Sequence, residues 1–203
     1  EETGGVNWGI VSVSLTKPSA GQCQEVISQL TNSNHWAIYI YHSSPDIVCL
    51  LLYQLLDIRT IMRIYIYYTK ITKDVILLLS RKITNNTSLL GLWISPDSIN
   101  DDGVIALTQS LINNKKITRL DLHDNPDITS TSAQSLAELL LSNHTLSYLR
   151  LNGTNIDSDG VLVLMESLRT NNTLRRLYLD NKHRQTCYSL PYYKTIENRL
   201  DFL

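Results

Sequence analysis

The chain has 203 residues with 18 basic and 19 acidic side chains, which gives a formal net charge of −1 at neutral pH. This balance favours neither a polyanion nor a membrane surface as partner. The longest apolar run, residues 47–56, is too short to cross a bilayer of about 30 Å, so no membrane partner is predicted. The three cysteines lie far apart, and we interpret them as buried free thiols, with no metal and no cofactor bound.

A strand motif recurs seven times along the chain, starting near residues 8, 35, 61, 89, 117, 146 and 174. Every copy has two apolar residues at the positions expected to face inward, from Val11 and Val13 in the first copy to Leu177 and Leu179 in the last. Repeats of 26–29 residues build solenoids, in which one strand and one helix stack on the next pair. We therefore expect a repeat array over residues 1–183.

The fourth copy shows how one unit is built. After the strand at 89–95, Pro96 and Asp97 predict a turn, and residues 100–103 supply the capping oxygens and acidic groups that begin a helix. Apolar residues then follow at helical spacing to Ile112. A polar residue eight positions after each start is predicted to bond the turn backbone. The series runs Thr16, Ser43, Thr69, Asp97, Asn125 and Thr154, and it is broken by Lys182.

Five asparagines, Asn85, Asn86, Asn143, Asn152 and Asn171, satisfy the N-x-[ST] glycosylation pattern. All except Asn152 fall where a helix returns to the next strand. Because asparagine tolerates the left-handed conformation that ends a helix, the repeat explains these four without a glycan. Residues 184–203 lack the repeat pattern, and we interpret them as a C-terminal capping segment over the last core.

The pattern L-x-x-L-x-L-x-x-N/T-x-I, followed by D-x-G, a helix and N-N/H-T-L, resembles ribonuclease-inhibitor-type leucine-rich repeats. The same repeats form the sensor arms of NACHT-type, NOD-like innate immune receptors. The resemblance covers most of the chain and is strongest over residues 61–181; the early units depart from it at His35, Cys49 and Val75. It implies an α/β horseshoe with a parallel sheet on the concave side and helices on the convex side. The repeat length and the absence of flanking cysteine clusters favour a cytoplasmic protein.

The outward strand positions form a grid of 21 residues, of which seven are aromatic and four are arginine. Strand propensity alone explains tyrosine on such a face, but it does not explain arginine, whereas binding hot spots are rich in both. We expect the concave face to bind a partner through a patch of seven residues. They are Tyr39, Tyr65, Tyr67, Trp93, Arg119, Arg150 and Tyr178.

Two other uses of this face are less favoured. Asp121 and His123 project from one strand, but an open sheet lacks the water-excluding pocket of a catalytic site. We therefore expect Asp121 to pair with Arg150, His123 to be a surface residue, and the protein not to be an enzyme. Nucleic acid is an unlikely partner because Asp121 and Asp180 interrupt any basic stripe.

The predicted function is protein–protein recognition, as the recognition or autoregulatory arm of a larger protein of the NOD-like receptor type. The chain begins Glu1-Glu2-Thr3 without methionine, so we expect a fragment, and the partner could be another domain of the same full-length chain. The alternatives are a stand-alone enzyme inhibitor or small-GTPase regulator of the same repeat class, and a structural spacer.

Overall fold

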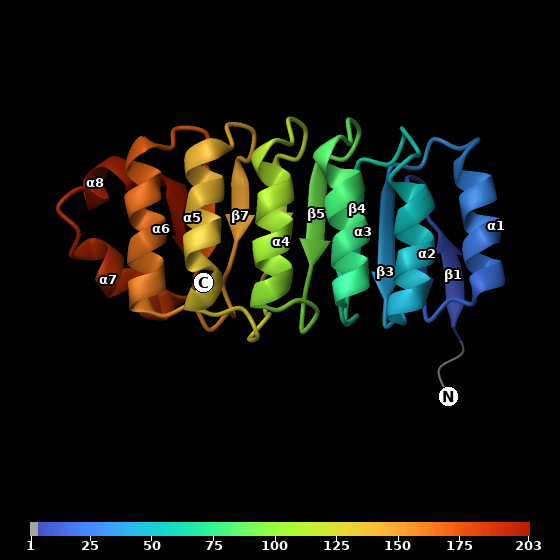
Figure 1. Ribbon diagram of the computed structural model, residues 1–203, viewed down its shortest axis with the longest axis horizontal. Coiled ribbons are helices and arrows are strands. Elements are labelled where there is room, and N and C mark those ends of the chain that lie inside the picture. The colour runs from blue at the N-terminus through green and yellow to red at the C-terminus, as the bar shows by residue number, and fades with distance from the viewer. Residues whose placement is uncertain (1–3) are drawn as a thin grey trace.

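The structure is a computed structural model that describes residues 4–203. Strands and helices alternate, and successive units lie side by side in chain order (Figure 1). The strands are β1 (Gly5–Trp8), β2 (Ser12–Thr16), β3 (Ala37–Tyr41), β4 (Arg63–Tyr67), β5 (Gly91–Ile94), β6 (Arg119–Asp121), β7 (Tyr148–Arg150), β8 (Arg176–Leu179) and β9 (Leu200–Phe202). The α-helices are α1 (Ala20–Leu30), α2 (Pro45–Leu55), α3 (Lys73–Thr84), α4 (Asp101–Ile112), α5 (Ala133–Ser142), α6 (Ser158–Thr170), α7 (Arg184–Tyr188) and α8 (Tyr193–Ile196).

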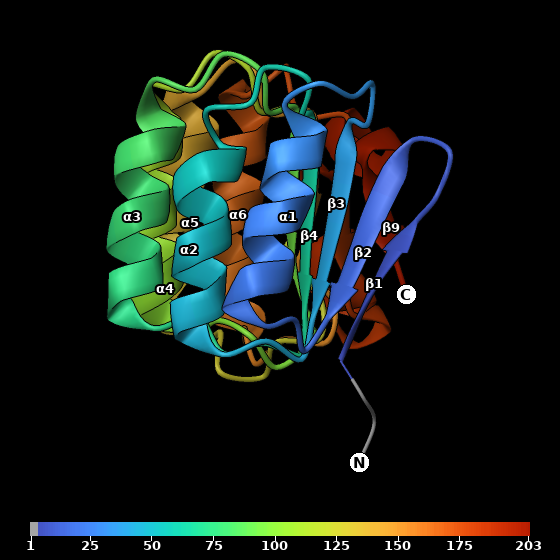
Figure 2. The same ribbon diagram turned by 90° about the vertical axis from the view of Figure 1, so that its right-hand side faces the viewer.

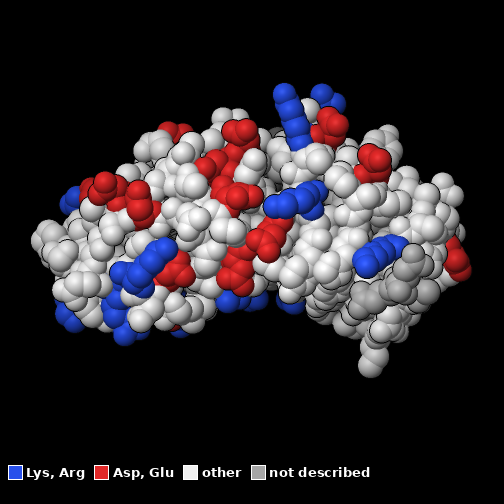
Figure 3. Space-filling view, turned by 90° about the horizontal axis from the view of Figure 1, so that it is seen from below, with Lys and Arg blue, Asp and Glu red and all other residues white. Residues whose placement is uncertain are grey.

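The nine strands of the described chain form one sheet in sequence order, parallel from β2 to β9. Helices α1–α6 form a second layer on one face of this sheet (Figure 2). The other face of the sheet is the hollow side of a curved array, seen along the lower outline in Figure 3. This arrangement confirms the predicted leucine-rich-repeat horseshoe, with the parallel sheet on the concave side and helices on the convex side.

The core lies between the two layers and repeats from unit to unit. In the fourth unit, Leu92 and Ile94 of β5 are fully buried beside Val104 and Leu107 of α4. Helix α4 begins as predicted, because the Asn100 side chain accepts a hydrogen bond from the Gly103 amide at 3.1 Å. Fully burying such an aliphatic side chain contributes about 1.5–3 kcal/mol to stability.

The first unit differs from the sequence prediction. Val11 and Val13 were expected to face inward, but Val13 and Leu15 are the buried pair, and they lie opposite Ile38 and Ile40. The expectation was two residues early because Trp8, taken as the start of the repeat, belongs to the extra strand β1. This strand forms an antiparallel hairpin with β2, and Val11 is 39% exposed at its turn.

The asparagines that follow the helices act through their side chains. The Nδ2 group of Asn143 donates to the Leu111 carbonyl at 2.7 Å, and its Oδ1 accepts from the Leu146 amide at 2.8 Å. Asn86, Asn114 and Asn171 make corresponding bonds in their own units. The predicted left-handed conformation is wrong, since Asn143 has φ −93° and ψ 124°. We call this repeated pattern the asparagine ladder.

A second line of bonds connects the turns after the strands. The amides of Ser43, Thr69 and Ser98 donate to the side-chain oxygens of Thr69, Ser98 and Asn125, respectively. Asp97 was predicted to hold the position that Ser98 occupies. It is instead an exposed residue with φ 49°, because the turn after β5 takes one more residue than its neighbour after β4. Left-handed conformations occur at these turns in the described chain, at Lys17, His42, Tyr68, Asp97, Asp124 and Gly153.

Residues 184–203 lie against the last unit, where β9 extends the sheet beyond β8. Arg199 donates to the carbonyl of Leu168 at 2.7 Å and also to that of Asn171. Arg199 lies 28 residues after Asn171, so its guanidinium makes the bonds that the next asparagine of the ladder would make. The interpretation of this segment as a cap remains a prediction that agrees with this geometry.

Candidate functional site

The concave face of β3–β5 carries a stack of three aromatic rings. Tyr39, Tyr65 and Trp93 lie directly opposite one another in the sheet register. The Tyr39 and Tyr65 centroids are 4.2 Å apart with 7° between the ring planes, and those of Tyr65 and Trp93 are 4.3 Å apart with 22°. Neighbouring strands are spaced at about 4.8 Å, which is close to the separation of offset-stacked rings, so the parallel sheet itself sets this arrangement. We call these three residues the ring stack.

Gly91 determines where the last ring of the stack lies. A Cβ atom at Gly91 would be 2.5 Å from Cη2 of Trp93, so the indole occupies the space that a side chain would need. Tyr65 is covered on both sides and is only 9% exposed, so it supports its neighbours and offers a partner little surface. Tyr41 and Tyr67 form a second pair beside the stack, with centroids 5.4 Å apart.

Arginine and tyrosine side chains cover the concave face of β6–β8. The Arg119 guanidinium lies 5.9 Å from the Tyr148 ring centroid, and the rings of Tyr148 and Tyr178 are 4.9 Å apart. Arg150 donates from Nε to Oδ1 of Asn152 at 2.7 Å. Arg119 is the most exposed of these side chains. We call Arg119, Tyr148, Arg150 and Tyr178 the arginine–tyrosine cluster.

Burial changes the pKa of four tyrosines on this face. It raises the pKa of Tyr41, Tyr65 and Tyr148, and it raises that of Tyr67 most, with the nearby Asp121 carboxylate adding to the effect. At neutral pH these side chains are therefore uncharged hydroxyl groups that can donate a hydrogen bond to a partner.

Asp121 is bound more tightly to His123 than to Arg150. Its Oδ1 lies 2.6 Å from Nδ1 of His123, whereas its Oδ2 lies 3.8 Å from the Arg150 guanidinium. The imidazole is mostly covered rather than a surface group as expected, and its Nε2 faces Asp124 at 3.7 Å. The hydroxyl of Ser95, on the neighbouring strand, donates to the His123 main-chain carbonyl and not to the imidazole. These bonds position the strand ends and present no activated nucleophile.

All seven side chains predicted to contact a partner project from the concave strand face, although their role in binding stays a prediction. Tyr41 and Tyr148 lie on the same face, and their rings are tilted against those of Tyr67 and Tyr178, respectively. In the first unit the sequence predicted Ile10, Ser12 and Ser14 on this face; Ser12 and Ser14 are confirmed, and Ile10 is wrong because it lies in the turn between β1 and β2. The side chains of β2 that share it are Ser12, Ser14 and Thr16, which the pairing of β2 with β3 shows.

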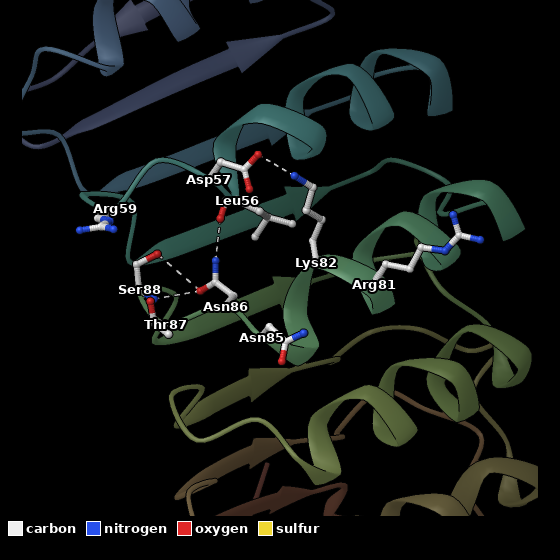
Figure 4. A pocket seen from close by; sticks show the side chains of 9 residues that line it. All are labelled: Leu56, Asp57, Arg59, Arg81, Lys82, Asn85, Asn86, Thr87 and Ser88. Carbon is white, nitrogen blue, oxygen red and sulfur yellow. Dashed lines mark hydrogen bonds and ion pairs between the residues drawn. The ribbon is translucent and has the colours of Figure 1, made fainter.

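One cavity lies on the concave face of the array, and another lies away from it. One of about 600 Å³ lies on the concave side between β1 and β3, where Ser14, Thr16 and Tyr41 line it. Another of about 330 Å³ lies at the loops between α3 and β5 (Figure 4). Its Lys82 is already paired with Asp57 at 2.6 Å, and its Asn86 belongs to the asparagine ladder. The second cavity is therefore explained by the packing of the array.

Within residues 4–203, no group of three or more His, Cys, Asp or Glu side chains is placed to hold a metal ion. None of the helices described here is long and apolar enough to cross a membrane. Cys23 and Cys187 are buried and Cys49 is partly buried, all three as free thiols. Burial raises the pKa of Cys187 to about 11, so this thiol is protonated and unreactive at neutral pH.

Comparison with known proteins adds to this picture of the fold. The chain matches no protein-family model and no curated protein. Among solved structures it is similar to a chain described as "Leiomodin-1 Actin-Binding Site 2 (ABS2)", with a TM-score of 0.55 and 20% sequence identity. The match covers 90% of this chain and 93% of that one. At this level of identity the two chains share a fold, and this chain is a leucine-rich-repeat array.

Proposed function

We propose that this array is a protein-binding module and that its concave strand face is the binding surface. The observation that carries the proposal is that one face of the sheet bears both the ring stack on β3–β5 and the arginine–tyrosine cluster on β6–β8. Aromatic and arginine side chains contribute most of the binding free energy in protein interfaces. The stacking also fixes their rotamers beforehand, which reduces the entropy lost on binding.

The charges support a protein rather than a nucleic acid. Arg176 pairs with Asp201 at 3.1 Å, and Arg150 lies near Asp121, so two arginines of the face already have acidic neighbours. At the edge of the sheet where the strands end, acidic side chains gather over the middle of the array (Figure 3). A groove that follows phosphates needs a continuous basic stripe, whereas a protein surface of mixed charge complements this one.

The proposal is tested by photo-crosslinking in cells that express the full-length protein. A photoreactive phenylalanine derivative at position 178 should crosslink a discrete protein, and Trp93→Ala in the same chain should reduce the yield at least tenfold. The matched control places the derivative at Leu141, which is 50% exposed on α5 of the convex side. Equal crosslinking from both positions, or a yield that Trp93→Ala leaves unchanged, would refute the concave face as the binding surface.

Actin is the first defined partner to test, because one solved structure that shares this fold is described as an actin-binding site. Co-sedimentation with filaments and a pull-down of monomers would each give a direct answer. A negative result with actin would exclude this one partner. The crosslinking experiment tests the concave face without assuming which protein binds it.

The resemblance to ribonuclease-inhibitor-type repeats supports a more specific proposal, that the array is the recognition or autoregulatory arm of a cytoplasmic NOD-like receptor. Its partner would then include a domain of its own chain. The sequence encoded upstream of Glu1 decides this point, since a nucleotide-binding module there supports a receptor. A stand-alone inhibitor or small-GTPase regulator would instead act on a purified target with residues 1–203 alone.

A further inference from the structure

The ring stack ends at Tyr39 because the next strand carries a small residue. Sheet register places Ser14 of β2 opposite Tyr39, and Thr16 opposite Tyr41. The rings of Tyr39 and Tyr41 lie 6.3 Å apart with only 6° between their planes, so together they form a flat wall at this end of the aromatic surface. One face of this wall is covered by Tyr65 and Tyr67, and the opposite face is directed toward β2.

The 600 Å³ cavity described above lies beside the Tyr41 end of this wall, and of the two rings only Tyr41 lines it. The strand β1 forms its far side, because the antiparallel hairpin places Asn7 opposite Ser14 and Gly5 opposite Thr16. A Cβ atom added to Gly5 would meet nothing within 4 Å, so this side is open. We call this space the hairpin groove. Its volume lies within the range of about 300–1,000 Å³ that is usual for ligand sites.

We propose that the hairpin groove receives an aromatic side chain of the protein partner, which stacks on the ring of Tyr41 and extends the pair of Tyr41 and Tyr67 by one ring. This inference rests on the proposed protein-binding function and specifies the chemistry of the partner at one position. An aromatic residue buries about 150–250 Å², and offset ring stacking adds to the binding free energy beyond this area.

The residues around the groove favour an aromatic side chain over other planar groups. Of the described residues that line it, none is a carboxylate that could pair with a guanidinium, and none is a lysine or arginine that could bind the phosphate of a nucleotide. His42 also lines the groove, and its ring stacks on that of Tyr68 with centroids 4.8 Å apart. Asn7, Ser14 and Thr16 supply neutral donors and acceptors. These suit the hydroxyl of a tyrosine or the N–H of a tryptophan, which need a hydrogen-bond partner when buried.

The test uses N-acetyl-L-tryptophanamide and N-acetyl-L-tyrosinamide as probes, titrated into the isotopically labelled protein and followed by NMR. We expect saturable shifts at the amides of Ser14, Thr16 and Tyr41 with a Kd of about 1–10 mM, which is typical of a single side chain in a preformed site. Ser14→Tyr places a ring of the protein itself in the groove and should weaken probe binding at least tenfold. Ser12→Tyr, two residues away on the same face of β2, is the matched control and should bind as the wild type does.

Several outcomes would overturn the proposal. These are the absence of saturable shifts in the wild type, unchanged binding by Ser14→Tyr, and a stronger response to N-acetyl-L-leucinamide, N-acetyl-L-argininamide or AMP. If Ser14→Tyr fails to fold, Tyr41→Leu removes part of the wall instead and should also weaken binding. If the probes do not bind but Trp93→Ala still reduces crosslinking, the proposal for the hairpin groove is refuted and the concave binding face is not. Loss of the crosslinking effect would refute the binding face as a whole.

Discussion

Replacing Asn143 by alanine tests the asparagine ladder most directly. The Asn143 side chain is 4% exposed and makes four hydrogen bonds to the main chain, two as donor and two as acceptor. Its backbone conformation, φ −93° and ψ 124°, is extended and available to alanine. The substitution therefore removes side-chain bonds without adding backbone strain.

The expected cost follows from the groups that lose their partners. The Leu111 and Asn114 carbonyls and the Thr145 and Leu146 amides each lose a bond. The Leu111 carbonyl keeps the Asn114 amide as a partner at 3.0 Å, whereas a buried polar group left without a partner costs about 1–3 kcal/mol. Thr145 is only half-buried, so water can replace one of the four bonds. We expect a loss of about 3–4 kcal/mol in the free energy of unfolding, which is a large part of the 5–15 kcal/mol typical of a domain.

The assay is urea unfolding followed by far-ultraviolet circular dichroism, with the free energy of unfolding obtained by linear extrapolation. Asn85→Ala is the matched control, since Asn85 is exposed and follows helix α3 at the same edge of the array. We expect it to change the free energy of unfolding by less than about 0.5 kcal/mol. If the two variants were equally stable, the ladder would be a consequence of the fold and not a source of its stability.

Three further predictions concern other parts of the array. Gly91→Ala should displace the Trp93 indole and destabilise the fold by about 1–3 kcal/mol, and the displacement should change the near-ultraviolet circular dichroism. Gly21→Ala is the control, because the nearest atom to an added Cβ there is 3.9 Å away, and it should change neither the spectrum nor the packing. Burial and the neighbouring lysine lower the pKa of His183, so the unfolded chain takes up a proton first as the pH falls through about 6.5. The urea midpoint should therefore be highest above this pH and decrease below it. If the midpoint of a His183→Gln variant decreased with pH as steeply as that of the wild type, the assignment to His183 would be wrong. Arg199→Ala should lower the free energy of unfolding by about 1.5–3 kcal/mol and speed amide hydrogen exchange in β8. Unchanged exchange in β8 would show that the last unit does not depend on the Arg199 guanidinium.

The sequence predicted the parallel array and its inward residues because apolar spacing reports burial directly. Ile38, Ile64 and Leu92 are fully buried as expected. The first unit was misplaced because the hairpin of β1 and β2 also alternates apolar and polar residues. Spacing alone could not separate Trp8 of that hairpin from the start of a repeat.

The candidate site was predicted as a face, but its internal contacts were not. Period-2 alternation shows that Tyr65 points outward, yet only the stacking of Tyr39 and Trp93 on either side shows that it is covered. Likewise, a turn signal at Asn143 identified the end of a helix. The bonds that explain this asparagine reach carbonyls 29 and 32 residues earlier in the chain, which a local pattern does not contain.

The asparagine ladder also restricts how this chain could be covalently modified. An N-linked glycan replaces one of the two hydrogens on the asparagine Nδ2, and in Asn143 both hydrogens are already donated, to the Leu111 and Asn114 carbonyls. A sugar attached there would remove one of these bonds and would require space that the neighbouring units fill. Asn85 is exposed and does not belong to the ladder, so a glycan on it would leave all hydrogen bonds of the ladder intact. Asn143 is thus a structural position whose modification and folding exclude each other, whereas Asn86 and Asn171 each donate one Nδ2 hydrogen to the ladder.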